Sequence, residues 1–383
     1  RYGNERHFTK IICERSVTLK VILSGGGTGG HIYPALAIGE ALKNKIEDVE
    51  ILYVGKKDSM EEELAKKEGL KFAPVHIKGF PRKKINKESI LTMMELIRGL
   101  HDAGEIIKEF KPDVVIGTGG YVCAPIVLKA QGKNIKTVIQ EQNAYPGKTN
   151  RLLAKRVDLI AYSFKEAEHF FPEHVKKLYT GNPIRSSFQK VQREKALKTL
   201  GLSDEKSLVL SFGGSGGQES TNEAVLEIMK EHKDLPFHLI HITGKEHYEG
   251  FVEKMPDVDK NSYTILDYSH QIPEFLAVAK LVVASSSAMT LAEISAMHLP
   301  SILIPKAYTA GNHQYHNAMS YKKADAAEVI EEKDLNGKML LQTMEKLLGD
   351  EELSRTMGDA AYGLINPKGT YEIVDAILEV VSS

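Results

Sequence analysis

The sequence of 383 residues is too long for one ordinary domain and is comfortable for two. Apolar residues make up 42% and charged residues 26%, which is normal for a folded soluble protein. The 50 basic and 51 acidic residues give a formal net charge of -1. This balance argues against a nucleic-acid binder that depends on bulk positive charge.

Two cysteines, Cys13 and Cys123, are too few for a disulfide scaffold or a Cys-based zinc site, and they suit a reducing compartment. The longest uncharged apolar run, Val114 to Leu128, is too short to span a bilayer. We therefore expect no membrane-spanning helix and no secretory signal. Residues 1–16 precede the first clear strand and are expected to form an N-terminal extension outside the fold.

The first half of the chain alternates short apolar runs with amphipathic stretches. LKVILSGG, which begins at Leu19, predicts a buried strand, and HIYPALAIGEALKNK predicts the helix after it. Further strands are predicted at ILYVG, DVVIGTG, TVIQEQ and LIAYS, with helical segments between them. This alternation is typical of a parallel sheet that is covered by helices on both faces.

The alternation pauses near Tyr179–Lys190 and then restarts. LVLSFGGSGG predicts a strand and ESTNEAVLEIMKEH a helix, and FHLIHITG, YTILDYS, LVVAS, SILIP and AEVIEE predict further strands. We interpret the chain as an α/β protein with two Rossmann-like domains, residues 17–184 and 185–365, and a cleft between them. Residues 366–383 include the helical segment TYEIVDAILEVV, which is expected to pack back on the N-terminal domain.

A glycine-rich loop, Ser24 to His31, lies between the first predicted strand and its helix. Its glycines let a ligand approach the backbone, and the following helix N-terminus is an anion site. A P-loop is excluded because His31-Ile32 stand where Lys and Ser or Thr are required. A dinucleotide site is disfavoured because Lys56-Lys57 stand where a ribose-binding acid is expected. His31 is either a proton-transfer group or a residue that only hydrogen-bonds the loop.

The second half carries a similar loop, Gly213 to Gly217, which is either a second anion site or a tight strand-to-helix turn. After the strand LVVAS, the residues from Ser287 to Thr290 open a helix whose N-terminus suits a pyrophosphate. Glu293, one turn inside, either accepts two ribose hydroxyls or is an exposed helix glutamate. The start of the next helix carries side chains that suit sugar hydroxyls or cap the helix: His313, Gln314 and Asn317.

Together these motifs resemble the MurG family, the UDP-N-acetylglucosamine transferases that convert lipid I to lipid II in bacterial peptidoglycan synthesis. The resemblance runs from Leu19 to about Val381 and rests on seven segments in this order: GGGTGGHIYPALAI, GTGGYVCAP, QEQNAYPGKTNRLLAK, GNPIR, FGGSGGQ, TLAEI and HQYHNA. One glycine loop is a weak signal, but GGTGGH together with QEQN-x-x-x-G-x-x-N is specific. The resemblance implies the GT-B fold, in which two Rossmann-like domains face a cleft.

The resemblance implies a donor, UDP-N-acetylglucosamine, in the C-terminal domain, with the uracil read near Leu266, the ribose bound by Glu293 and the diphosphate bound by residues 288–290. The complete implied donor set is Arg185, Ser215, Gly216, Leu266, Ala288, Met289, Thr290, Glu293, Gln314 and Asn317. The acceptor, undecaprenyl-pyrophosphate-linked N-acetylmuramyl-pentapeptide, is assigned to the N-terminal domain. The implied acceptor set is Thr28, Gly29, Gly30, His31, Gly119, Gly120, Tyr121, Gln142 and Asn143.

One position departs from the family pattern. The family usually has an Arg and a Gly in the turn before TLAEI, whereas this chain has Ala284-Ser285-Ser286-Ser287, with Ser285 as the equivalent of the Arg. A cation that would offset the diphosphate charge is therefore missing. Either the helix dipole and the backbone suffice, or another cation such as Arg185 replaces it.

The implied reaction is an inverting displacement, in which the 4-hydroxyl of the acceptor sugar attacks C1 of the donor sugar and UDP leaves. A helix N-terminus aimed at the diphosphate stabilises its growing charge, so no metal and no other cofactor are expected. Asp257-Val258-Asp259 has the spacing of a metal-binding DxD, but it lies in a polar stretch and is interpreted as a surface loop. His31 is the first candidate for the base, and Glu141 is the second.

A basic segment from Lys78 to Lys87 contains no acid, and the helix after it carries apolar residues at helical spacing. These features indicate either core packing beside a solvated loop or contact with an anionic membrane surface. The membrane interpretation assigns the contact to Arg82, Lys83, Lys84, Ile90, Met94 and Ile97. It predicts a peripheral protein at the cytoplasmic face of the bacterial cell membrane, with cell-wall synthesis proteins as further partners.

Three alternatives to the lipid I transferase remain open from the sequence. They are a UDP-sugar transferase that acts on a diacylglycerol lipid, a UDP-N-acetylglucosamine 2-epimerase, and a non-catalytic scaffold that binds a UDP-sugar. The QEQN segment favours the lipid I transferase over the first alternative. The epimerase would need acids in the cleft, and the departure at Ser285 is the feature that leaves the scaffold open.

Overall fold

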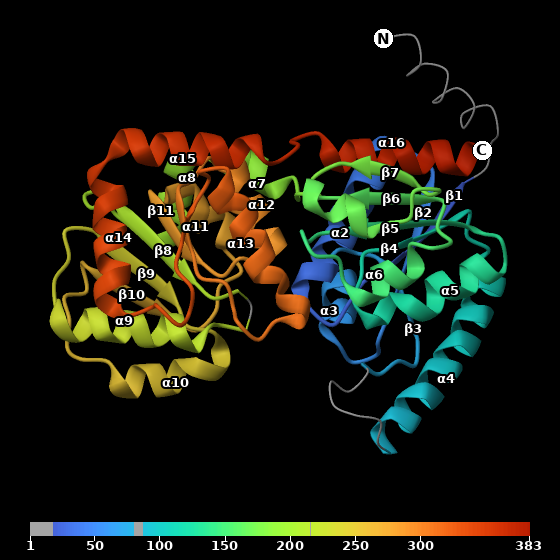
Figure 1. Cartoon of the computed structure of the whole chain (residues 1–383), viewed down its shortest axis with the longest axis horizontal. Coiled ribbons are helices and arrows are strands. Elements are labelled where there is room, and N and C mark those ends of the chain that lie inside the picture. Colours follow the sequence, from blue (N-terminus) through green and yellow to red (C-terminus); the bar gives the residue numbers. More distant parts are fainter. Residues whose placement is uncertain (1–17, 80–86, 215) are drawn as a thin grey trace, which may run out of the picture.

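The computed structural model describes residues 18–79, 87–214 and 216–383, and it has two α/β domains placed side by side (Figure 1). The predicted extension, residues 1–16, lies outside the described residues, as do residues 80–86 and Ser215. Two parallel sheets of seven and six strands confirm the predicted fold class of two Rossmann-like domains. No helix in the described segments is both long and apolar enough to cross a bilayer.

The N-terminal domain is built on a parallel sheet with the order β3-β2-β1-β4-β5-β6-β7. Its strands are β1 (Leu19–Ser24), β2 (Val49–Gly55), β3 (Lys71–Pro74), β4 (Val114–Gly117), β5 (Lys136–Glu141), β6 (Leu159–Tyr162) and β7 (Lys176–Tyr179). Its helices are α2 (Gly29–Lys45), α3 (Met60–Lys67), α4 (Lys87–Phe110), α5 (Ala124–Gly132) and α6 (Lys148–Leu153). The sequence did not predict β3 and β7, because these short edge strands are partly exposed and lack an apolar run.

The central strands of this sheet are buried on both faces, which is why they contain so many Val, Ile and Leu residues. Successive side chains of a strand point to opposite faces. Val21 and Leu23 of β1 therefore pack in the core on the α2 side, whereas Ile22 between them packs in the core that includes Ile126 of α5. The sheet thus separates two hydrophobic cores within one domain.

The C-terminal domain repeats this plan on a parallel sheet with the order β10-β9-β8-β11-β12-β13. Its strands are β8 (Leu208–Phe212), β9 (His238–Ile242), β10 (Tyr263–Leu266), β11 (Leu281–Ala284), β12 (Ser301–Leu303) and β13 (Glu328–Val329). Its helices are α8 (Arg193–Leu200), α9 (Glu219–Glu231), α10 (Lys245–Lys254), α11 (Ile272–Val278), α12 (Ala288–Ala296), α13 (His313–Lys323), α14 (Gly337–Gly349) and α15 (Glu351–Gly363). The strand predicted at AEVIEE is reduced to β13, which contains only the second and third residues of this segment, Glu328 and Val329.

The chain passes between the domains twice. It leaves β7, continues through the short helix α7 (Ser187–Lys190) and enters α8, and it returns after α15 into α16 (Gly369–Ser382). Figure 1 shows α16 lying along the N-terminal domain. Ile373, Val374 and Ile377 of α16 are fully buried in the core on the α2 side.

Both sheets have a point where the strand order reverses, between β1 and β4 in one domain and between β8 and β11 in the other. In doubly wound sheets, ligands bind beyond the carboxyl ends of the strands at such a point. The loops that follow these four strands carry, in chain order, the first glycine-rich loop up to His31, the segment GTGG at residues 117–120, the second glycine-rich loop at residues 213–217 and the Ser285–Ser287 turn. The fold therefore places the predicted motifs where ligands are expected.

Candidate functional site

Three loops meet at the carboxyl edge of the N-terminal sheet, where β1, β4 and β5 are neighbours. They carry the predicted acceptor residues Thr28 to His31, Gly119 to Tyr121, and Gln142 with Asn143. The Thr118 hydroxyl donates to the carbonyl oxygen of His31 at 2.6 Å. The side chain of His31 makes a separate contact, in which its Nδ1 lies 2.9 Å from Oε1 of Gln142. The structure therefore gathers the predicted acceptor loops around His31.

Glu141, the second candidate for the base, has a carboxylate that is engaged on both oxygens. Oε1 accepts hydrogen bonds from the backbone N–H of Asn143 at 2.9 Å and from its Nδ2 at 3.1 Å. Oε2 accepts from the backbone N–H of Gly147 at 3.1 Å and from Nδ2 of Asn150 at 2.9 Å. Only 1% of Glu141 is exposed. Because both carboxylate oxygens bind groups that follow β5, Glu141 stabilises the conformation of this loop.

The predicted donor residues lie at the corresponding edge of the C-terminal sheet. Gly216 is exposed in the loop after β8, whereas Ala288, Met289 and Thr290 form the buried first turn of α12 after β11. Leu266 ends β10, two strands from β8, and its carbonyl oxygen accepts from the N–H of Thr243 at 2.9 Å. Ser215, which belongs to the same predicted set, lies outside the described residues.

Ser285 directly follows the strand β11 and lies beside the second glycine loop. A Cβ atom built on Gly214 would lie 3.4 Å from the Ser285 Oγ. The side chain is buried, with 1% exposed, and its hydroxyl has no hydrogen-bond partner in the described part of the chain. A buried polar atom without a partner costs about 1–3 kcal/mol. A ligand that hydrogen-bonds at this point would recover that cost.

Arg185 links the two predicted sites through contacts with both domains. Its guanidinium stacks over Tyr33 of α2, 4.4 Å from the ring centre, and its Nη2 lies 3.5 Å from Oε1 of Glu293 in α12. Burial raises the pKa of Glu293 to about 7, although the charge of Arg185 acts in the opposite direction. The carboxyl group therefore changes its charge near neutral pH, and only its ionised form accepts hydrogen bonds on both oxygens.

Asn317, a predicted donor residue, contacts the loop that carries the predicted acceptor residues. It is fully buried. Its Oδ1 accepts from the backbone N–H of Ala144 at 2.8 Å, and its Nδ2 donates to Oδ1 of Asn143 and to the carbonyl oxygen of Ser286, both at 3.1 Å. The neighbouring Gln314 accepts the N–H of Lys306 on its Oε1 at 3.0 Å. The two predicted sites are thus directly connected.

Two further residues at these edges were missed by the sequence analysis. Lys306 follows β12, and its ammonium donates to the carbonyl oxygen of Gly217 at 2.6 Å. Burial lowers the pKa of Lys306, and the carboxylate of Glu332 opposes this shift. Lys306 is, after Arg185, the second cation near the predicted donor residues. Its position directly after the predicted strand SILIP was the signal in the sequence that could have identified it.

The other missed residue is Asn182, which is 5% exposed and lies between the domains. Its Nδ2 donates to the carbonyl oxygen of Gln142 at 3.1 Å and to that of Ala288 at 3.3 Å. One amide therefore ties the loop after β5 to the first turn of α12. The motif GNPIR, which contains Asn182, was the signal that could have identified it.

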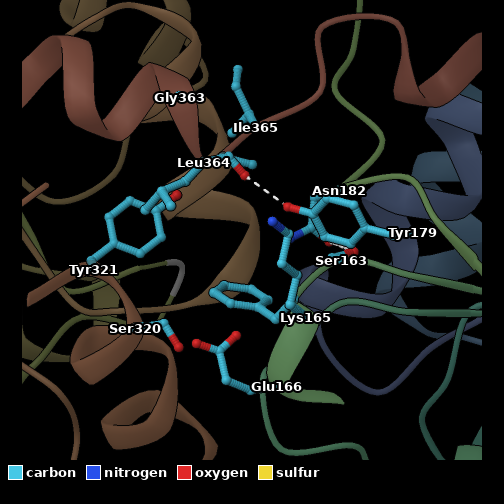
Figure 2. A pocket seen from close by; sticks show the side chains of 12 residues that line it. Ser163, Lys165, Glu166, Tyr179, Asn182, Ser320, Tyr321, Gly363, Leu364 and Ile365 are labelled. Atoms are coloured by element: carbon cyan, nitrogen blue, oxygen red, sulfur yellow. Dashed lines mark hydrogen bonds between the residues drawn. The ribbon is translucent and has the colours of Figure 1, made fainter. Parts of the chain in front are cut away.

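A cavity of about 140 Å³ also lies at the junction of the domains (Figure 2). None of the predicted donor or acceptor residues lines it. Figure 2 shows Lys165 and Glu166 beside it, and Tyr179 donating to the carbonyl oxygen of Leu364 at 3.4 Å. Ser163, another lining residue, donates to Oδ1 of Asn182 at 2.9 Å. The cavity is therefore separate from the two predicted sites, although Asn182 belongs to its wall.

The predicted membrane residues fall into two groups. Residues 82–84 lie outside the described residues, and the side chain of Ile90 is not described. Met94 and Ile97 are 48% and 61% exposed on α4, and the same helix exposes Leu91 and Met93. The alternative that the apolar residues at helical spacing pack in the core is therefore wrong for Met93, Met94 and Ile97. Figure 1 shows α4 extending away from the sheet of the N-terminal domain.

Each of the two domains matches a model of the same protein family. A family model described as the glycosyltransferase family 28 N-terminal domain matches residues 21–162, and the model of the C-terminal domain of the same family matches residues 208–375. A protein of Acetivibrio thermocellus is 43% identical over 365 residues, which cover 94% of this chain and 99% of the relative. A protein of Halalkalibacterium halodurans is 42% identical and covers 94% of this chain and 99% of the relative.

Both relatives are named UDP-N-acetylglucosamine--N-acetylmuramyl-(pentapeptide) pyrophosphoryl-undecaprenol N-acetylglucosamine transferase. Among solved structures, MurG of Acinetobacter baumannii has a TM-score of 0.74 and 22% identity, and covers 95% of this chain and 100% of that chain. A putative UDP-N-acetylglucosamine 2-epimerase of Listeria monocytogenes has a TM-score of 0.70 and 16% identity, covering 94% and 96%. These two structural matches establish the shared fold alone.

Proposed function

Because the chain belongs to glycosyltransferase family 28 and, within it, to the MurG family, we propose that it transfers N-acetylglucosamine from UDP-N-acetylglucosamine to lipid I. The attacking group is the 4-hydroxyl of the N-acetylmuramyl unit, and the product is lipid II. The observation that carries this proposal is a set of relatives named for this transfer, which match nearly the whole chain at about 40% identity.

The base in this reaction is His31. It lies where the loops after β1, β4 and β5 meet, and it is partly exposed. An imidazole titrates in the range that suits proton transfer at physiological pH. The alternative base, Glu141, already accepts four hydrogen bonds from N–H groups of its own loop and of α6. This difference favours His31 as the base and Glu141 as the group that holds the acceptor loop.

The donor binds across the loops after β8, β11 and β12. The free N–H groups of residues 288–290 at the start of α12 face the diphosphate and stabilise the charge that grows on it as UDP leaves. Glu293 accepts the ribose hydroxyls. Arg185 and Lys306 supply positive charge at this edge, where Ser285 replaces the arginine of the family pattern.

An acceptor-dependence assay tests the proposed reaction. The purified protein is given radiolabelled UDP-N-acetylglucosamine with and without a lipid I analogue. We expect UDP release and a labelled lipid product only when the analogue is present. Release of UDP without the analogue would instead indicate an epimerase or a hydrolase, and binding without turnover would indicate a scaffold. A diacylglycerol acceptor added in a parallel reaction checks the remaining alternative.

We further propose that α4 contacts an anionic membrane surface at the cytoplasmic face of the cell membrane. Leu91, Met93, Met94 and Ile97 are each about half exposed or more on this one helix. A contiguous exposed apolar surface of this kind marks a site of contact with a membrane or with another protein. The acceptor of the proposed reaction is anchored by a polyprenyl chain, so a membrane is the surface that this helix would meet. Basic residues beside such a helix add about 1 kcal/mol each near an anionic surface.

Liposome co-sedimentation tests this contact. The double variant Met94→Ser, Ile97→Ser and the triple variant Arg82→Ser, Lys83→Ser, Lys84→Ser are each expected to reduce binding to anionic vesicles. The apolar double variant should also lose binding to neutral vesicles, whereas the basic triple variant should not. A control, Met339→Ser, removes a 40% exposed methionine from α14 in the C-terminal domain. Unchanged sedimentation of both variants would remove α4 from this role.

A further inference from the structure

The side-chain amide of Gln142 is fixed in one orientation by its own contacts. The residue is buried, with 1% exposed. Its Nε2 lies 2.7 Å from the carbonyl oxygen of Thr118 and 2.9 Å from that of Gln140. Because a backbone carbonyl oxygen only accepts hydrogen bonds, both contacts require the NH₂ end of the amide. Oε1 therefore points away from these carbonyls, and it lies 2.9 Å from Nδ1 of His31.

This contact determines which ring nitrogen of His31 carries the proton. The amide oxygen of Gln142 only accepts, so Nδ1 must be the donor. In a neutral imidazole with its hydrogen on Nδ1, the other nitrogen, Nε2, is an acceptor. No hydrogen bond of Nε2 is found within residues 18–79, 87–214 and 216–383. The nitrogen that can take a proton is thus the one without a protein partner in the described structure.

Two glycines keep the ring in this orientation. Gly119 and Gly120 have φ angles of 105° and 72°, which favour glycine. A Cβ atom at Gly119 would lie 2.8 Å from Nδ1 of His31, and one at Gly120 would lie 3.2 Å from Cδ2. The backbone after β4 therefore packs directly on the imidazole and leaves it little room to turn Nε2 toward Gln142.

We propose that Gln142 is a positioning residue that holds His31 in the tautomer whose Nε2 accepts the proton of the attacking hydroxyl. This inference rests on the proposed function. In the reaction the hydroxyl proton passes to Nε2 and the hydroxyl oxygen forms a bond to C1 of the donor sugar. The bond between C1 and the diphosphate oxygen breaks, and its electron pair leaves with UDP. The opposite tautomer would carry a hydrogen on Nε2 and could not accept the proton.

The tautomer can be measured without any turnover, by ¹⁵N NMR of protein labelled at histidine, with His31→Ala used to assign the signals. At pH 8 we expect a protonated Nδ1 and an unprotonated Nε2 in the wild type. Gln142→Met keeps the side-chain length and removes the accepting oxygen, so it is expected to give a mixture of both tautomers. A wild-type His31 with its hydrogen on Nε2 would overturn the proposal, as would an unchanged tautomer in Gln142→Met.

Kinetics with the lipid I analogue provide a second readout. Gln142→Met is expected to lower kcat about 10- to 100-fold and to leave the KM of the donor unchanged. Gln142→Glu again offers an acceptor to Nδ1 and should restore part of kcat, although its second oxygen faces the carbonyl oxygens of Thr118 and Gln140, which limits the recovery. Because a carboxylate favours the protonated imidazole, it should also move the acidic limb of the pH–activity profile about one unit higher. Equal losses in both variants, with no movement of this limb, would leave Gln142 as a structural residue only.

Gln131→Met is the matched control. Gln131 is also a buried glutamine, 7% exposed, and its Nε2 donates to the carbonyl oxygen of Leu153 at 3.0 Å. It has no hydrogen bond to His31, so the tautomer should not change. Calorimetry with UDP checks that each variant is folded. If the wild type shows no acceptor-dependent turnover, the proposed function fails, whereas the NMR measurement tests the role of Gln142 separately.

Discussion

The two ligand-facing edges of this protein share one plan but treat their polar groups differently. At the N-terminal edge, His31, Gln142 and Glu141 are held by hydrogen bonds to neighbouring loops. At the C-terminal edge, Ser285 Oγ and Gln218 Oε1 are buried and have no partner in the described part of the chain, whereas the unpartnered buried oxygen beside Glu141 at the N-terminal edge, Asn150 Oδ1, belongs to a side chain whose Nδ2 is hydrogen-bonded to Glu141. Within the residues that the structure describes, the ion pair of Glu293 is a long contact of 3.5 Å with Arg185.

This difference indicates two kinds of site on one type of sheet. A group that transfers a proton must be held in position before the substrate arrives, and the N-terminal edge provides this. A site that binds a nucleotide gains affinity when the ligand satisfies polar atoms that the protein leaves unpaired. Under the proposed function, the same strand–glycine loop–helix unit would position the base in one domain and bind the nucleotide in the other.

The largest expected effect comes from removing the positioned group. His31→Ala should lower kcat by about 10²- to 10⁴-fold, because the other candidate for the base, Glu141, already accepts four hydrogen bonds. UDP affinity should be unchanged, since His31 lies at the other edge. Steady-state kinetics and calorimetry measure the two quantities. An exposed histidine of the same domain provides the control, His174→Ala, which should retain activity. Near-normal turnover in His31→Ala would remove His31 from the role of base.

A smaller effect is expected at the binding edge, from Glu293→Gln. Wild-type affinity for UDP should rise between pH 6 and 8, as the carboxyl group ionises through its pKa of about 7. The variant should bind about tenfold more weakly at pH 8 and should lose this pH dependence. Calorimetry at three pH values measures both.

The same substitution has the opposite effect on stability. Folding raises the pKa of Glu293 from 4.5 to about 7, so its contribution to stability is present below pH 4.5 and is lost as the pH rises through 7. Glu293→Gln should therefore raise the free energy of unfolding at pH 8, by roughly 1–3 kcal/mol. Equal or lower stability at pH 8 would contradict a buried carboxylate whose burial is only partly compensated by Arg185.

The C-terminal domain contains a second histidine whose tautomer is fixed by its contacts, and it can be compared with His31 of the N-terminal domain. His241 of β9 is fully buried, with Nε2 3.0 Å from Oδ1 of Asn222 and Nδ1 2.9 Å from Oγ of Ser211. Burial lowers its pKa to about 3. The unfolded chain therefore binds a proton that the native state does not, and stability falls as the pH drops from about 6.5 toward 3.

His241→Gln should remove this acid sensitivity, which amounts to at most about 1.4 kcal/mol per pH unit. Hydrogen exchange of the β8 and β9 amides at pH 5 and pH 7.5 measures the effect within the C-terminal domain. The variant should be less stable than the wild type at pH 7.5, because two hydrogen bonds are altered. Identical pH dependence in both proteins would show that His241 does not set the acid limit.

The smallest effect is expected where the two edges touch. Tyr145 follows the QEQN segment and stacks on His316 of α13 at 5.3 Å between ring centres. Tyr145→Ala should weaken the contact between the domains by about 0.5–1.5 kcal/mol. Small-angle scattering without ligand should then give a larger radius of gyration than for the wild type. Tyr371→Ala, which removes a 44% exposed tyrosine from α16, is the control.

The sequence predicted the two sheets because their inner strands are continuous apolar runs, and it predicted the loops because glycines mark their positions. It missed β3 and β7, whose pairing depends on a neighbouring strand more than on their own residues. The roles of Gln142 and Asn182 could not be predicted, because they depend on contacts between loops far apart in the chain. Lys306 was missed for the same reason, since Gly217 lies 89 positions before it.

The return of α16 to the N-terminal domain has a consequence for biosynthesis. Ile373, Val374 and Ile377 fill the core beside α2, so the first domain to leave the ribosome lacks part of its interior until residues 369–382 emerge. Domains usually fold one after another during synthesis. In this protein, folding of the N-terminal domain stays incomplete, with part of its apolar core surface exposed, while the whole C-terminal domain is translated. Completion of the first domain thus becomes a late event, and one on which a chaperone has time to act.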